Sequence, residues 1–128
     1  MKELPRLTDP ELEIMQIVWE NGEMSIGDVL ERYNAERKDA EKVIRTTIQV
    51  QMVRLEEKGW LSHREDGRTF RYRATRKKDT ASRDIIRDIS ERVFSGSTTE
   101  LVKHLLGSKP VDPQELEKLK KLINEYGK

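Results

Sequence analysis

The feature that most constrains the fold of this chain is the change of hydrophobic period at Gly59. From about Val43 to Lys58 the apolar residues recur at helical spacing, and after Gly59 they alternate with a period of two. Glycine often ends a helix because it adopts positive φ without strain from a Cβ atom. The sequence therefore predicts a helix that stops at Gly59 and is followed at once by β-strands.

Two short strands joined by a tight turn are predicted after Gly59. Residues 60–64 and 69–74 alternate, and the Asp66-Gly67 pair between them is a strong hairpin signal. One side of the second strand should pack on a core, and the other side is basic. The inward set is Phe70, Tyr72 and Ala74, and the outward set includes Arg71 and Arg73.

The predicted helix before Gly59 has two faces with different tasks. At about 100° per residue, one face collects four apolar side chains that should be buried. They are Ile44, Ile48, Met52 and Leu55. The opposite face is poor in charge and carries Thr46, Val50 and Val53, flanked by Thr47, Gln49 and Arg54. Because a solvated helix face seldom carries valines, we expect this outer face to contact a partner.

Two capped helices precede this one. Thr8 with Glu11, and Ser25 with Asp28, each have the spacing of a capping box before an apolar helical run. The order is therefore helix, helix, helix and hairpin, which is the winged helix-turn-helix arrangement. In that arrangement the third helix fits the major groove of DNA, and the hairpin tip reaches a phosphate or a neighbouring groove.

The charge of the chain is concentrated, although its net value is only +1. Residues 1–36 carry three basic and nine acidic side chains (−6), and residues 37–78 carry thirteen basic and six acidic (+7). Residues 79–128 carry nine of each. A positive stretch that coincides with the third helix and the hairpin favours a phosphate-backbone binder. On charge alone, a solvated basic surface without a partner is the alternative.

Three amphipathic helices are predicted after residue 78. The predicted fold is mostly α with a small β-hairpin: a winged-helix DNA-binding domain over 1–78 and a three-helix dimerisation region over 79–128. With 34% hydrophobic and 38% charged residues in the chain, helices of this size bury too little alone, so a homodimer is favoured over an internal core. The predicted dimerisation residues are Ile85, Ile89, Val93, Leu101, Leu105, Leu116, Leu119 and Ile123.

Several classes of protein are excluded or disfavoured by the sequence. The chain has no cysteine, so disulfides, thiol nucleophiles and thiolate metal sites are excluded. His63 and His104 lie in different segments, and no phosphate loop or nucleophile beside a base is present, so we expect no metal, no cofactor and no enzyme activity. No secretory signal or membrane span is visible, which predicts a cytoplasmic protein without membrane insertion.

Several segments resemble the penicillinase repressor family, which contains the β-lactamase and methicillin-resistance repressors. They are Leu7 to Met15 with Val18-Trp19, Thr46 to Gln49, Arg54 to Gly59, and Gly67 to Tyr72. The resemblance implies a homodimeric repressor on a palindromic operator, with DNA contacts at Thr46, Thr47 and Val50. With the geometry above, the predicted DNA-binding residues are Thr46, Thr47, Gln49, Val50, Arg54, Arg64, Arg68, Arg71 and Arg73.

Two features of the sequence bear on regulation and on the alternative function. Family members induced by β-lactams have a membrane sensor protease as a partner, which cuts them at an Asn-Phe bond. The equivalent position here is His104-Leu105, a departure that argues against regulation by cleavage. The alternative function is a winged-helix protein-interaction module without nucleic acid, which should show an exposed apolar patch away from the basic stretch.

Overall fold

The chain divides into two compact units, one ending at Asp84 and the other comprising Ile85–Lys128. The computed structural model describes residues 4–128. The division falls inside helix α4 (Lys78–Phe94), whose first turns therefore belong to the first unit. The boundary predicted from the sequence, between residues 78 and 79, lies at the start of the same helix and remains a prediction.

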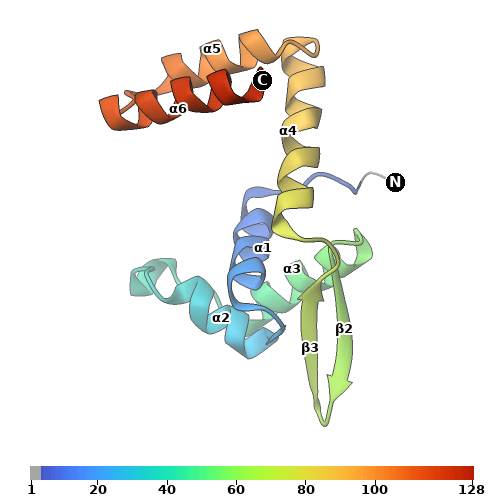
Figure 1. Cartoon of the computed structure of the whole chain (residues 1–128). Coiled ribbons are helices and arrows are strands. Elements are labelled where there is room, and N and C mark those ends of the chain that lie inside the picture. The colour runs from blue at the N-terminus through green and yellow to red at the C-terminus, as the bar shows by residue number, and fades with distance from the viewer. Residues whose placement is uncertain (1–3) are drawn as a thin grey trace. The chain divides into compact units, whose positions relative to one another are not determined.

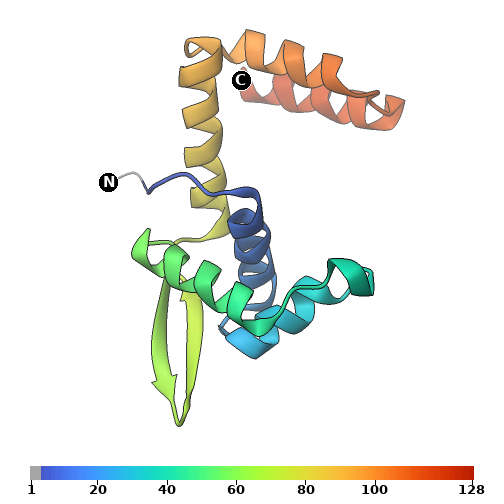
Figure 2. The same ribbon diagram turned by 180° about the vertical axis from the view of Figure 1, so that it is seen from behind.

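The first unit consists of helices packed beside a small antiparallel sheet (Figures 1 and 2). Its elements are α1 (Asp9–Asn21), β1 (Met24–Ser25), α2 (Ile26–Asn34), the short 3-10 helix η1 (Asp39–Glu41), α3 (Arg45–Glu57), β2 (Leu61–Asp66) and β3 (Thr69–Ala74). The strand order is β1-β3-β2. The predicted hairpin is present, and β1 adds a third strand that the sequence did not predict.

The two predicted capping boxes begin α1 and α2. The backbone N–H of Glu11 donates to Thr8 Oγ1 at 3.3 Å, and that of Thr8 donates to Glu11 Oε1 at 2.8 Å. Ser25 and Asp28 form the same reciprocal pair at 3.1 and 3.2 Å. Gly59 has a φ of 90°, as expected for the residue that ends α3.

The core of the first unit joins α1, α2, α3 and the sheet, and it includes Ile48, Met52 and Leu55 of the predicted α3 stripe. It contains Ile14, Met15, Val18, Met24, Ile26, Val29, Ile48, Met52, Leu55, Trp60, Leu61, Tyr72 and Ala81. Two indole N–H groups tie distant segments to it: Trp60 donates to the carbonyl of Pro5 at 2.8 Å, and Trp19 to that of Arg76 at 3.0 Å. The two rings meet edge to face with centroids 6.5 Å apart. These contacts join the segment before α1 and the segment after β3 to the core on which α3 and the hairpin pack.

Two residues predicted to be inside are instead exposed. Ile44 is 69% exposed, because α3 starts at Arg45 and Ile44 is its extended N-cap residue, not part of the buried stripe. Phe70 is 42% exposed, because the hairpin extends beyond the core and leaves its outer half without a covering element. The Phe70 ring stacks on His63 instead, with centroids 4.4 Å apart.

A buried ion pair joins the start of α1 to the end of α3. Glu11 is 1% exposed, and its Oε1 accepts from Lys58 Nζ at 2.6 Å. Burial alone would raise the pKa of Glu11, but the hydrogen bonds from Lys58 and Thr8 outweigh it and hold the pKa below its usual value. A depressed carboxyl pKa contributes stability above the unfolded-state value, and that contribution is lost as the pH falls through the folded-state pKa.

Replacing Glu11 by glutamine should lower the free energy of unfolding by about 1–3 kcal/mol at pH 7, because Lys58 loses its carboxylate while the capping geometry is kept. Urea unfolding at pH 7 and at pH 3 measures this. The difference in unfolding free energy between E11Q and wild type should be smaller at pH 3 than at pH 7, because the stability contributed by the ionised carboxylate declines as the pH falls below the unfolded-state pKa. E20Q, at an exposed position of the same helix, should match wild type at pH 7. An equal difference in unfolding free energy at both pH values would mean that the ionised Glu11 carboxylate does not stabilise the fold.

The second unit contains the end of α4 together with α5 (Thr98–Ser108) and α6 (Pro113–Tyr126). The hydroxyl of Ser97 caps α5 by accepting from the Glu100 N–H at 3.2 Å, and Asp112 caps α6 by accepting from the Gln114 N–H at 2.8 Å. No residue in the range 85–128 is buried in the single chain. All eight predicted dimerisation residues are thus exposed or half-buried. Over residues 4–128, no helix combines the length and apolar character needed to span a membrane.

Candidate DNA-binding surface

The outward face of α3 is neutral and partly apolar. Val50 is 43% exposed and Val53 is 39% exposed, whereas Ile48, Met52 and Leu55 on the opposite side are buried. The other predicted contact residues of this helix are also exposed: Thr46, Thr47, Gln49 and Arg54. The structure therefore brings the five predicted residues of α3 together on its accessible side, where their contacts with DNA remain a prediction.

The start of α3 differs from those of α1 and α2 in its chemistry. Its N-cap residue, Ile44, makes no side-chain hydrogen bond, and the first turn contains no acidic residue. Both α1 and α2 begin instead with a capping box and a carboxylate. Free N–H groups and the positive end of a helix dipole favour an anion such as a phosphate. The exposed Arg45 and Thr46 add a cation and a hydroxyl at the same place.

Two of the predicted hairpin arginines form no salt bridge or hydrogen bond with a carboxylate among residues 4–128. Arg68 lies in the exposed turn between β2 and β3. The Nε of Arg73 donates to Ser62 Oγ at 3.2 Å, which orients the side chain without neutralising it. Both side chains therefore keep their charge available to a phosphate.

The other two hairpin arginines are paired with acids. Arg64 donates to both carboxylate oxygens of Glu23, with Nη2 2.7 Å from Oε1. The hydrogen bond from Arg64 lowers the pKa of Glu23, so the carboxylate stays ionised. Arg71 contacts Asp66 at 3.0 Å and Asp28 at 3.8 Å. The predicted set of basic residues thus splits into unpaired and paired members.

The sequence pattern did not identify every residue that shapes this surface, neither at the start of α3 nor among the acids that pair with the hairpin arginines. It placed Ile44 in the core and did not single out Arg45, although both are exposed beside the predicted face. The available signal was the β-branched Ile44 immediately before the basic Arg45. It also missed Glu23, which lies 41 positions from Arg64 and which no local pattern connects to the hairpin.

His63 connects the hairpin to α3 and is not placed for metal binding. Its Nδ1 lies 2.7 Å from Glu56 Oε1, and its ring contacts Phe70 and Tyr72. His104 is in the other unit, where its Nδ1 lies 2.8 Å from the Glu100 carbonyl oxygen. Across residues 4–128, no group of three or more potential ligands could hold a metal ion.

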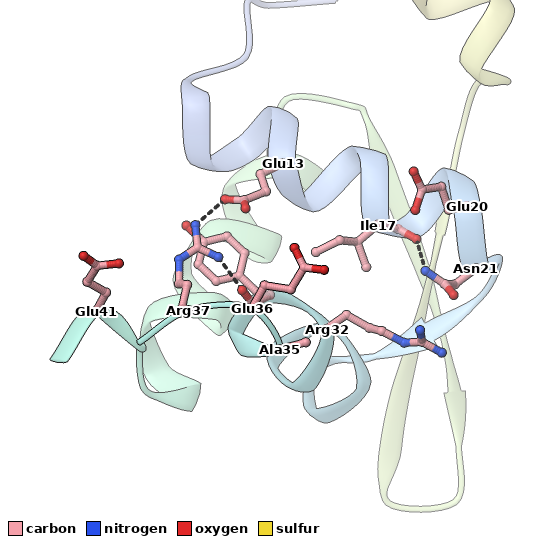
Figure 3. A pocket seen from close by; sticks show the side chains of 10 residues that line it. Glu13, Ile17, Glu20, Asn21, Arg32, Ala35, Glu36, Arg37 and Glu41 are labelled. Atoms are coloured by element: carbon pink, nitrogen blue, oxygen red, sulfur yellow. Dashed lines mark hydrogen bonds and ion pairs between the residues drawn. The ribbon is translucent and has the colours of Figure 1, made fainter. Parts of the chain in front are cut away.

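A polar pocket of about 580 Å³ lies between α1 and the end of α2 (Figure 3). Arg37 lies in it, bonded to Glu13 at 2.6 Å and to the carbonyl of Tyr33, with its guanidinium 3.8 Å from the Tyr33 ring centroid. The lining includes four glutamates and two arginines: Glu13, Glu20, Glu36, Glu41, Arg32 and Arg37. Because acids predominate, this pocket does not suit a phosphate, and α3 with the hairpin remains the candidate surface.

Comparison with known proteins settles the family. The family model for the penicillinase repressor matches residues 7–125. The chain belongs to the penicillinase repressor family. It is 25% identical to the penicillinase repressor of Bacillus licheniformis, over 98% of this chain and 95% of that protein. It is 24% identical to the methicillin resistance regulatory protein MecI of Mammaliicoccus sciuri, over 93% and 94%.

A solved relative supports the fold of the first unit in this penicillinase repressor family member. The solution structure of the DNA-binding domain of the repressor BlaI is similar, with a TM-score of 0.51 and 29% identity over 61% of this chain and 90% of that one. The predicted winged-helix fold and the family resemblance are therefore confirmed. The family is one of repressors and not of enzymes.

Proposed function

We propose that this family member is a transcriptional repressor that binds a palindromic operator as a homodimer in the cytoplasm. The observation that carries the proposal is the exposed, charge-poor Thr-Val face of α3 beside an uncapped helix start. Membership of the penicillinase repressor family supports DNA binding and repression. The protein-interaction alternative is not favoured.

DNA recognition would combine base contacts from the outer face of α3 with phosphate contacts from the arginines of α3 and the hairpin. With α3 in the major groove, the Val50 methyls suit contact with thymine methyl groups, and Thr46 and Thr47 suit phosphate or base contacts near the helix start. Arg54 and Arg68 flank this contact and neutralise phosphates. The base contacts would supply sequence preference, and the phosphate contacts would fix position and supply affinity.

The dimer is supported by the second unit. Its apolar side chains line one side of each helix and are left uncovered in a single chain, including Leu105, Leu122 and Ile123. Exposed apolar stripes on three consecutive helices are typical of an interface, because monomeric proteins rarely leave large contiguous apolar patches in contact with water. Two copies joined here would present two α3 helices to half-sites roughly 34–36 Å apart, or a multiple of that distance.

The cheapest test is the salt dependence of binding to random duplex DNA. About three or four phosphate contacts per protomer, from Arg45, Arg54, Arg68 and Arg73, predict a slope of about −3 in log K against log salt for each protomer. Fluorescence anisotropy with a labelled duplex measures the slope. In R68Q the slope should be shallower by about 0.9, because one phosphate contact is lost. Absence of duplex affinity at low salt would refute the DNA-binding function.

A further inference from the structure

Two arginines face each other on the hairpin. Arg64 of β2 and Arg71 of β3 are direct cross-strand partners in the antiparallel ladder. Like charges directly opposite one another in neighbouring strands repel. On an isolated hairpin, both side chains would be relieved of this repulsion by binding a phosphate. In this structure, carboxylates of the same chain take that place.

The carboxylate beside Arg64 comes from the segment between α1 and β1. The single Nε–H of Arg64 is shared between the two carboxylate oxygens of Glu23, at 3.0 and 3.1 Å, and Nη2 donates to Oε1 at 2.7 Å. This fork-like geometry is the one in which a guanidinium binds a carboxylate or a phosphate. Strand β1 holds Glu23 there, because Met24 pairs with Tyr72 and Ser25 pairs with Arg71.

The pair remains accessible to a competing anion. The Arg64 side chain is 57% exposed and that of Glu23 is 31% exposed. An exposed ion pair contributes little to stability, so removing the carboxylate should leave the fold intact and free the guanidinium for a phosphate. Glu23 therefore has the position of an internal competitor for Arg64, and it has no hydrogen bond to α3 that would alter the base-reading face.

We propose that Glu23 limits sequence-independent DNA binding by competing with DNA phosphates for Arg64. This inference rests on the proposed DNA-binding function and adds to it a residue that determines specificity. Non-specific binding depends almost entirely on the number of phosphates neutralised. Each guanidinium held by an internal carboxylate reduces that number, while the contacts of Val50 and its neighbours are unaffected. Glu23 acts on DNA binding only through Arg64, by occupying its guanidinium.

The test is the variant Glu23→Gln, which keeps the shape of the side chain and removes its charge. We expect its affinity for a random duplex at 50 mM salt to rise roughly threefold to tenfold. The slope of log K against log salt should become steeper by about 0.9, because Arg64 now neutralises a phosphate. The midpoint of thermal unfolding should stay close to wild type. A merely structural role would change the midpoint and leave the salt slope as it was.

Three further variants make the result specific. Glu20→Gln removes the same charge from an exposed position of α1 that forms no salt bridge within residues 4–128, and it should keep the wild-type slope. Glu23→Asp retains a competing carboxylate and should stay close to wild type. Glu23→Gln combined with Arg64→Gln should lose the added slope, since the released guanidinium is absent.

The outcomes separate this inference from the function on which it rests. If the wild-type protein binds no random duplex at low salt, the DNA-binding function itself is wrong. If wild type binds but E23Q keeps its slope, or E20Q shows the same gain, competition by Glu23 is refuted. A loss of affinity in E23Q would also overturn the proposal, because it would mean that Glu23 orients Arg64 toward a phosphate.

Discussion

Replacing Val50 by aspartate is expected to lower operator affinity by roughly 100-fold or more, about 3 kcal/mol, while the winged helix stays folded. Val50 lies on the accessible face of α3 and is 43% exposed, so the substitution leaves the core stripe of Ile48, Met52 and Leu55 untouched. In the complex the new carboxylate would be desolvated without a partner among negatively charged phosphates. A duplex selected from random DNA by the wild-type protein provides the operator for the titration.

Two variants separate the loss of contact from the effect of charge in this experiment. V50A removes the methyl groups without adding a charge, and it should weaken operator binding by roughly tenfold or less. Q16D adds the same charge at an exposed position of α1 and should bind like wild type. Circular dichroism and thermal unfolding report whether V50D is folded. Unchanged affinity of folded V50D would mean that the outer face of α3 does not read DNA.

The parts of the fold that depend on neighbouring residues were predictable from the sequence. The capping boxes at Thr8 and Ser25 need only a partner three positions away, and the hairpin turn needs only the Asp66-Gly67 pair. The buried stripe of α3 follows from helical geometry once the helix is assigned. Each of these signals is contained within a few residues, so tertiary structure had little opportunity to override it.

The parts that depend on distant residues were not predictable in this way. Strand β1 has two residues and exists because Met24 and Ser25 pair with Tyr72 and Arg71, far along the chain. Ile44 has the right spacing for the core but lies just before the first turn of α3, where its backbone is already extended. A periodic pattern identifies the face of a helix, whereas the exact helix start depends on packing.

The candidate site shows the same division. Exposure of Thr46, Thr47 and Val50 follows from the orientation of one helix and was anticipated from the sequence. The hairpin arginines were treated as equivalent, because a count of charges along the chain contains no information about their partners. The structure distinguishes Arg68, which is unpaired among the described residues, from Arg64, which is bound to Glu23. Ion pairing between separate elements is therefore the information that the sequence pattern lacked.

The second large effect is expected from Ile123→Asp, which should convert a homodimer into a monomer. Ile123 is 65% exposed in the single chain and shares one face of α6 with Leu116 and Leu119, two other predicted dimerisation residues. A buried, unpaired charge at an apolar interface costs about 2–5 kcal/mol, and the symmetric dimer would contain two copies of it. Sedimentation should give about twice the 15.0 kDa chain mass for wild type and a single chain for I123D.

Operator binding should fall together with dimerisation, because a monomer gives up the linkage between two half-sites. The effective concentration gained by linking two sites is worth roughly 10²–10⁴ in affinity, so I123D should bind a full operator about as weakly as a half-site. Asn124→Asp adds the same charge on the polar side of α6 and should remain dimeric with wild-type affinity. If I123D still sediments as a dimer, or if wild type is a monomer at micromolar concentration, the C-terminal helices do not form the interface. Retention of half-site binding by monomeric I123D would show that the winged helix recognises DNA independently of the second unit.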